Sequence, residues 1–138
     1  MKLTRRDAMA LGLGATAVAM LPMRAFAAAE DAIAAFTEGA EIGEGGVMLD
    51  APEIAENGNT VPISVDAPGA VSVAIFAAGN PTPGVATFNF GPAAGSQSAS
   101  TRMRLAGTQD VIAVAKMADG TFSKTSATVK VTIGGCGG

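Results

Sequence analysis

The sequence predicts an all-β protein, an immunoglobulin-like β-sandwich of about seven strands preceded by a short helix. Three observations lead to this fold class. After residue 46, short segments recur in which apolar and polar residues alternate, as in strands with one buried face. Turns rich in Gly and Pro separate these segments. With one cysteine and no tryptophan, the chain lacks the Cys…Trp…Cys signature of true immunoglobulin domains, and a small barrel is the structural alternative.

Residues 1–27 have the layout of a cleavable export signal. Basic residues at the start precede an apolar segment, 8–21, and the small-residue site Ala25-Phe26-Ala27 follows. We expect cleavage after Ala27. The alternative is a membrane anchor, but the apolar segment is shorter than the ~20 residues that span a bilayer.

The pair Arg5-Arg6 allows a more specific interpretation of this leader. The run Thr4-Arg5-Arg6-Asp7 resembles the twin-arginine signal, which directs folded proteins to the periplasm. Ala8-Met9 departs from the bulky apolar pair usual at that point, so an ordinary secretory signal with two arginines is the alternative. We expect a periplasmic protein that has no membrane segment after cleavage.

The pattern of residues 30–38 predicts a short helix that lies over the edge or end of a sheet. The acidic pair Glu30-Asp31 suits a helix start, and Gly39 suits its end. Ile33, Phe36 and Ala40 recur at helical spacing and form a narrow apolar stripe. Residues 41–46 are expected to be a loop.

Seven segments with the character of strands follow. Asn57-Gly58-Asn59 marks a turn before the second, and Pro62 within it indicates an edge because proline has no N–H to donate. The third places Val71, Val73 and Ile75 on one face. The predicted strands are 47–49, 60–65, 71–76, 85–90, 98–105, 110–117 and 121–133.

The last three of these strands carry the clearest signals. Residues 98–105 place Arg102 and Arg104 on one face and apolar residues on the other. The strand 110–117 is strongly apolar and therefore central. Asp119-Gly120 is the strongest hairpin signal in the chain. In the final strand, the inward residues are expected to be Val129, Val131 and Ile133, and the outward ones Lys130 and Thr132.

The predicted domains are the leader 1–27, a sandwich 28–133 and a tail 134–138. Removing 27 of 138 residues leaves 111, enough for one modest core. That part carries 5 basic and 11 acidic residues, a net charge of −6. This charge argues against binding of nucleic acid or anionic lipid.

The composition lacks the commonest catalytic groups. The chain has no histidine, the commonest general base and metal ligand, and no carboxylate pair stands out. We therefore expect no catalytic site, no metal and no cofactor. Arg102 and Arg104 are candidates for binding an anion, although the pattern favours a solvated strand face.

The tail Gly134-Gly135-Cys136-Gly137-Gly138 holds the one strong chemical candidate. Cys136 is the only cysteine, so it cannot form an internal disulfide. Four glycines around it predict a flexible arm, because glycine samples most of backbone space. No cation is adjacent to stabilise the thiolate. The pattern predicts an accessible thiol that other proteins load and unload.

With this tail, the chain resembles the SoxY family, the sulfur-carrier subunits of the bacterial thiosulfate-oxidising Sox system. The leader and the run 57–63 support the resemblance. It implies an immunoglobulin-like carrier without catalytic activity, paired with a SoxZ-like subunit. Cys136 would hold sulfur covalently, on a swinging arm made of Gly134, Gly135, Gly137 and Gly138. SoxAX-, SoxB- and SoxCD-like enzymes would load the thiol, release sulfate and oxidise the remaining sulfur.

Two other interpretations remain open. Ubiquitin-like sulfur carriers also end in a diglycine, as Gly137-Gly138 does here, but they are cytosolic and have a substantial helix between their strands. The second interpretation is a structural module that dimerises through Cys136.

Overall fold

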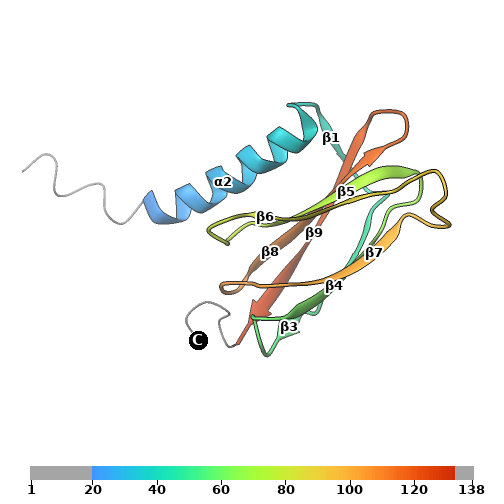
Figure 1. The fold of residues 1–138 in the computed structure, drawn as a ribbon. Helices are drawn as coiled ribbons and strands as arrows, with labels where there is room; N and C mark the ends of the chain where they lie inside the picture. Colours follow the sequence, from blue (N-terminus) through green and yellow to red (C-terminus); the bar gives the residue numbers. More distant parts are fainter. Residues whose placement is uncertain (1–19, 133–138) are drawn as a thin grey trace, which may run out of the picture.

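Nine strands in two sheets pack face to face as a β-sandwich (Figure 1). The structure is a computed structural model that describes the backbone of residues 20–132 and the side chains of residues 27–132. The strands are β1 Ile42–Glu44, β2 Met48–Asp50, β3 Ile54–Ala55, β4 Val61–Asp66, β5 Ala70–Ala77, β6 Gly84–Asn89, β7 Ser98–Met103, β8 Gln109–Met117 and β9 Phe122–Val131. The predicted fold class is confirmed.

The larger sheet has the order β1-β9-β8-β5-β6, and the smaller sheet has the order β2-β4-β7. Strand β9 is lined on one edge by two short parallel partners, β1 at 122–124 and β3 at 130–131. β1 lies in the segment 41–46 that we expected to be a loop, and β3 lies between the predicted strands 47–49 and 60–65. β1 has three residues and β3 has two, so neither is long enough for an alternation of apolar and polar residues to be recognised in the sequence.

The main core lies between the two sheets. Strand β4 alternates as predicted, with Val61, Ile63 and Val65 buried, and Val129 of β9 is fully buried. Val73 and Ile75 share the buried face as predicted, but Val71, which was predicted to lie on the same face, is 41% exposed. The register of β5 against β8 shifts between Ala70 and Ser72, and this irregularity turns Val71 outward. Ile133 lies outside the described residues.

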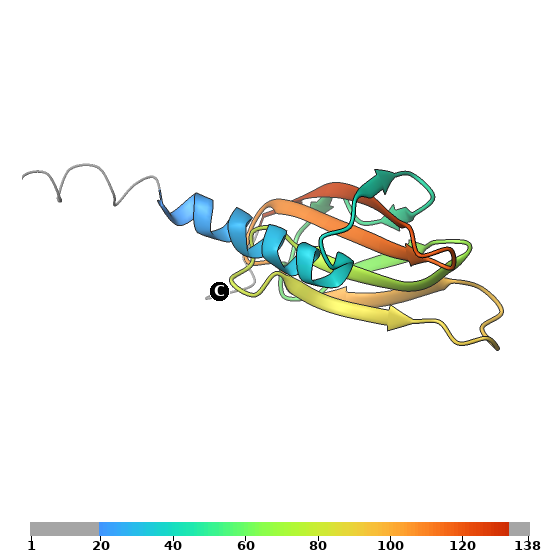
Figure 2. The same ribbon diagram turned by 90° about the horizontal axis from the view of Figure 1, so that it is seen from above.

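The helix α2, Met20–Thr37, covers the outer face of the larger sheet (Figures 1 and 2). It begins ten residues before the predicted start, since the Ala- and Met-rich segment assigned to the leader also favours a helix. Its N-terminal part extends past the sandwich (Figure 2). Among residues 20–132, no helix has both the length and the apolarity needed to cross a bilayer.

The helix packs on a sheet face and not, as predicted, on an edge or end. Ile33 and Phe36 pack against a second buried cluster that includes Phe76 and Phe122. The Phe36 ring meets those of Phe76 and Phe122 edge-on, with centroids 6.4 and 5.9 Å apart. The helix ends at Thr37, and Glu38 and Gly39 follow in the left-handed region, with φ of 56° and 77°. Ala40 lies beyond the helix and is exposed, so it is not part of the stripe.

Other local predictions are confirmed. Strand β8 is central, between β9 and β5. β2 pairs only with residues 64–66 of β4, so β4 has an open edge at Pro62. Asp119-Gly120 forms the turn between β8 and β9, and Gly120 has a φ of 87°. There the Thr121 hydroxyl and N–H donate to Asp119 Oδ1 at 2.6 and 3.0 Å, and these hydrogen bonds hold the pKa of Asp119 below its ordinary value.

Candidate functional site

The predicted thiol and its arm, Cys136 with its four flanking glycines, lie outside the described residues. The structure does describe the point from which they leave the domain. We call Val131 and Thr132, the end of β9 and the next residue, the tail root. The N–H of Thr132 donates to the Ala55 carbonyl at 3.0 Å, and its hydroxyl donates to the Glu56 carbonyl at 3.3 Å. The tail root is thereby held against β3.

The other side of the tail root is held by the loop between β7 and β8. The N–H of Val131 donates to the Thr108 hydroxyl at 3.0 Å. Lys130, the residue before, donates its N–H to the Glu53 carbonyl at 2.9 Å. Hydrogen bonds from both sides therefore hold the last residues of β9, and the tail starts from a defined position.

A side-chain network ties the loops at this end of the sandwich together. The buried Gln109 side chain accepts from the Gly79 N–H at 2.8 Å and donates to Asn80 Oδ1 at 2.8 Å and to the Gly107 carbonyl at 3.0 Å. Asn80 also donates to the Arg104 carbonyl at 2.8 Å and accepts from the Ala106 N–H at 2.9 Å. These residues were not predicted from the sequence, because their partners are up to 30 positions away and no motif marks them.

A groove of about 510 Å³ lies beside the tail root. It exists because β2 ends at Asp50 and leaves the first half of β4 without a neighbour on that side. Ala55 belongs both to the groove and to the contacts of the tail root. The groove is lined by Pro52, Ile54, Ala55, Glu56, Asn57, Thr60 and Pro62. It therefore begins where the tail leaves the domain.

Arg102 and Arg104 lie on the far side of β4 from this groove. Arg102 is the register partner of Pro62, a groove residue, so the two side chains share the outer face of the smaller sheet. The N–H of Leu105 donates to the Gly58 carbonyl at 2.8 Å, which keeps Arg104 alongside the segment before Val61. Both arginines are exposed, as predicted.

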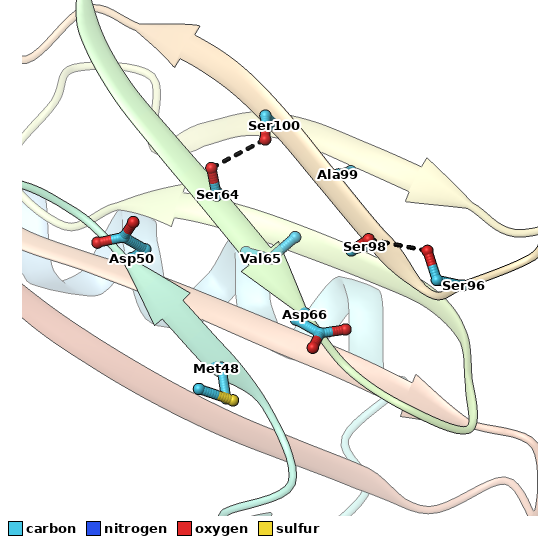
Figure 3. A pocket seen from close by; sticks show the side chains of 9 residues that line it. All are labelled: Met48, Asp50, Ser64, Val65, Asp66, Ser96, Ser98, Ala99 and Ser100. Atoms are coloured by element: carbon cyan, nitrogen blue, oxygen red, sulfur yellow. Dashed lines mark hydrogen bonds between the residues drawn. The ribbon is translucent and has the colours of Figure 1, made fainter.

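A second hollow of about 510 Å³ lies on the outer face of the smaller sheet (Figure 3). The Ser64 and Ser100 hydroxyls are 2.8 Å apart, and those of Ser96 and Ser98 are 3.0 Å apart. A serine nucleophile needs an adjacent base, and these hydroxyls pair with each other. Among the side chains that the structure describes, no three His, Cys, Asp or Glu residues gather as metal ligands. The hollow also includes the carboxylates of Asp50 and Asp66, without a third metal-ligating side chain among the described residues.

Comparison with protein families identifies this chain. The model of the family described as sulfur oxidation protein SoxY matches residues 33–136, which include the sandwich and Cys136 itself. That match spans well over half of the chain. The chain therefore belongs to the SoxY family, as the resemblance in its sequence indicated. No curated protein sequence matches it significantly.

Solved structures agree with this assignment. The chain is similar to the sulfur carrier protein SoxY from Chlorobium limicola f thiosulfatophilum, with 38% identity, a TM-score of 0.68, and coverage of 78% of this chain and 96% of that one. It also resembles the superoxide reductase (neelaredoxin) from Ignicoccus hospitalis, with 13% identity, a TM-score of 0.55, and coverage of 63% and 80%. At that identity, the likeness shows the shared fold alone.

Proposed function

We propose that this protein is a non-catalytic sulfur carrier that holds thiosulfate-derived sulfur covalently on Cys136. The observation that carries the proposal is the match to the SoxY family, which extends to Cys136. A relative 38% identical is itself described as a sulfur carrier protein. Cys136 is also the only thiol in the chain, so it is the only residue that can hold sulfur in this way.

The proposed loading step is an oxidation. The Cys136 thiol and thiosulfate form a sulfur–sulfur bond, which gives Cys–S–S–SO₃⁻, a proton and two electrons. A SoxAX-like haem enzyme accepts the electrons. Water then cleaves the terminal sulfonate as sulfate in a SoxB-like enzyme, which leaves Cys–S–S⁻ and two protons. A SoxCD-like enzyme oxidises the remaining sulfur.

The sequence around the thiol supports activation of Cys136 by the partner enzymes and not by the tail. No basic residue follows Lys130, so the tail does not supply the positive field that stabilises a thiolate. Activation falls to the partner enzymes. From Thr132 to Cys136 the chain spans four residues, or roughly 13–14 Å when extended. Glycines on both sides of Cys136 present no side chains to a narrow channel, which suits a swinging arm.

The proposed setting is the periplasm, with a SoxZ-like subunit as a heterodimeric partner. Export by the twin-arginine route and cleavage after Ala27 would remove the first part of α2. The remaining helical residues include the buried Ala29 and the packed Ile33 and Phe36. The contacts that cover the larger sheet therefore stay with the mature chain.

The test is an intact mass of the exported protein from cells grown on thiosulfate, before and after reductant. We expect an adduct of sulfane sulfur or thiosulfonate that maps to Cys136 and is lost on reduction. Cys136→Ser should abolish it while leaving folding unchanged, because the residue follows the last strand. A disulfide dimer without any sulfur adduct would instead support a structural module and contradict the carrier function.

A further inference from the structure

We propose that the open edge of β6 is the surface on which the SoxZ-like subunit docks, and that this subunit adds a strand to the larger sheet there. The inference rests on the proposed pairing with a SoxZ-like subunit and names the part of this chain that makes the contact. The chemistry required of the partner is simple. It is a folded domain with an extended edge strand whose backbone pairs with the backbone of Thr87 and Asn89.

Strand β6, Gly84–Asn89, is the last strand of the larger sheet. It pairs with β5 on one side, and within residues 20–132 no strand pairs with its other side. The opposite edge of the same sheet is covered, since β1 and β3 both pair with β9. The register of β6 against β5 shifts near Gly84, so the regular part of the open edge is 86–89.

The backbone of β6 has free hydrogen-bonding groups in the right direction. The N–H of Phe90 donates to the Val71 carbonyl at 2.9 Å, and β6 continues from there in antiparallel register with β5. In such a ladder, every second residue directs both of its backbone groups towards the neighbouring strand. Phe88 and Phe90 therefore face β5, whereas Thr87 and Asn89 direct their N–H and carbonyl groups to the open side. Both of these residues are exposed, so a partner strand can reach them.

The lack of charge along this edge also indicates an interface. No Asp, Glu, Lys or Arg occurs in residues 67–101, which include β5, β6 and the loops on both sides of β6. A central strand such as β5 is expected to lack charge, but exposed edge strands usually carry charges that prevent pairing with another chain. Charged residues are also depleted in the centre of protein interfaces. The open edge of β6 therefore has the character of an edge that is paired in the assembled protein.

Apolar surface next to this edge supports the same conclusion. Phe88 and Phe90 pack against the main core but remain half-buried. A strand added beside β6 lies about 4.8 Å from it and covers the exposed parts of these rings. The other open edge is β7, at the side of the smaller sheet, and it carries the exposed Arg102. β6 is thus the better edge for pairing with another chain.

The position of β6 and the charge of the chain favour the SoxZ-like subunit over a second copy. The part after residue 27 has a net charge of −6, so two copies of it repel each other. β8 and β5 separate β6 from β9, a distance of three strand spacings or about 14 Å (β6 is yellow and β9 red in Figure 2). A subunit that stays bound at β6 therefore leaves the tail at the end of β9 accessible to the enzymes.

The first experiment is amide hydrogen exchange of the exported protein, alone and in complex with the SoxZ-like subunit. In the chain alone, the amides of Thr87 and Asn89 should exchange rapidly because they have no partner strand. In the complex, both should exchange at least about tenfold more slowly, since each donates to the added strand. The amides of Phe88 and Phe90 face β5 and should be protected in both states.

The second experiment is a charge substitution on the edge. Thr87→Lys should weaken the affinity for the SoxZ-like subunit about tenfold or more, because a lysine on an edge strand opposes pairing. Ser126→Lys is the matched control, since it places the same charge on an exposed position of β9, in the same sheet. It should leave the affinity unchanged. Titration calorimetry measures both, and thermal unfolding verifies that both variants fold.

Three outcomes would overturn the docking surface. A complex in which Thr87 and Asn89 still exchange rapidly would place the partner elsewhere and leave the pairing itself intact. Protection that appears in the chain alone as its concentration rises would mean that a second copy occupies the edge. Equal affinities of Thr87→Lys and the unchanged protein would also contradict it. Loss of the sulfur adduct on Cys136 in a chain that still forms the complex would instead count against the carrier function and leave this surface intact.

Discussion

The two ends of the sandwich are held together in different ways. At the end where β8 turns into β9, the chain closes by a tight turn, Asp119-Gly120, whose hydrogen bonds join residues two apart. At the opposite end, where the tail leaves, side chains bond to loops far away in sequence. Thr132 is bonded to Glu56 across 76 positions, and Gln109 to Gly79 across 30. The turn end has long-range hydrogen bonds too, such as the one from the Gly69 N–H to the Gln97 side chain, but the network around a buried side chain lies at the end that presents the proposed carrier thiol.

This difference suggests why a carrier domain needs so many contacts around a tail. A tail that swings between enzymes is useful only if it starts from a defined place. Hydrogen bonds on both sides of the tail root, from the Glu53–Glu56 segment and from Thr108, hold the last residues of β9 in one position. The comparison can be tested by weakening each end separately.

The largest effect is expected from the two glutamines, one at each end. Gln109→Ala removes three hydrogen bonds of a buried side chain, and the free energy of unfolding should fall by about 2 kcal/mol. Gln97→Ala at the other end removes one long, exposed bond, 3.4 Å from the Gly69 N–H, and should cost about 0.5 kcal/mol or less. Urea unfolding of both variants measures the difference. Equal losses would mean that the Gln109 network does not distinguish the tail end.

The contrast between local and long-range contacts also separates the features that the sequence predicts from those that it does not. The Asp119-Gly120 turn, the central place of β8 and the alternation of β4 were predicted because each depends on neighbouring residues. The Gln109 network was not, because no local pattern indicates which loop a buried amide will meet. The early start of α2 was missed for another reason, since leader and helix favour the same apolar residues.

The features of the candidate site can also be separated into those that the sequence indicates and those that depend on the folded chain. Cys136 stands out by residue type and by its glycine neighbours, and Arg102 and Arg104 stand out as a pair on one strand face. The groove beside the tail root depends on where β2 stops pairing with β4. That boundary is a property of the folded chain, so the sequence could indicate the chemical groups but not this surface.

A smaller effect is expected from two glycines, again one at each end. Gly120 has a φ of 87° with nothing within 4 Å of an added Cβ, so Gly120→Ala should cost about 1 kcal/mol through backbone strain alone. Gly107, in the loop next to the tail root, also has open space but no positive φ. Gly107→Ala should therefore be neutral or slightly stabilising. Thermal unfolding of both variants is the measurement, and a loss at Gly107 as large as that at Gly120 would contradict this account.

The smallest effect is expected in the pH dependence of stability, through Asp119 at the turn end. The Thr121 hydroxyl, then its N–H, hold the pKa of Asp119 below its ordinary value of 3.8. A carboxyl whose folded pKa is depressed contributes stability above its unfolded pKa, and this contribution is lost as the pH falls through the folded pKa. The turn should therefore weaken only in acid, below about pH 4.

Thr121→Val tests this assignment, because it removes the hydroxyl and keeps the N–H. An NMR titration should show the pKa of Asp119 rising towards 3.8 in the variant. The variant should lose slightly more stability at neutral pH than at a pH below the folded pKa, where Asp119 is already protonated. The tail end should not respond, because the Asn80 and Gln109 side chains that hold it do not titrate. A Thr121→Val variant whose stability loss is the same at both pH values would show that the hydroxyl acts on the turn without acting through the carboxylate.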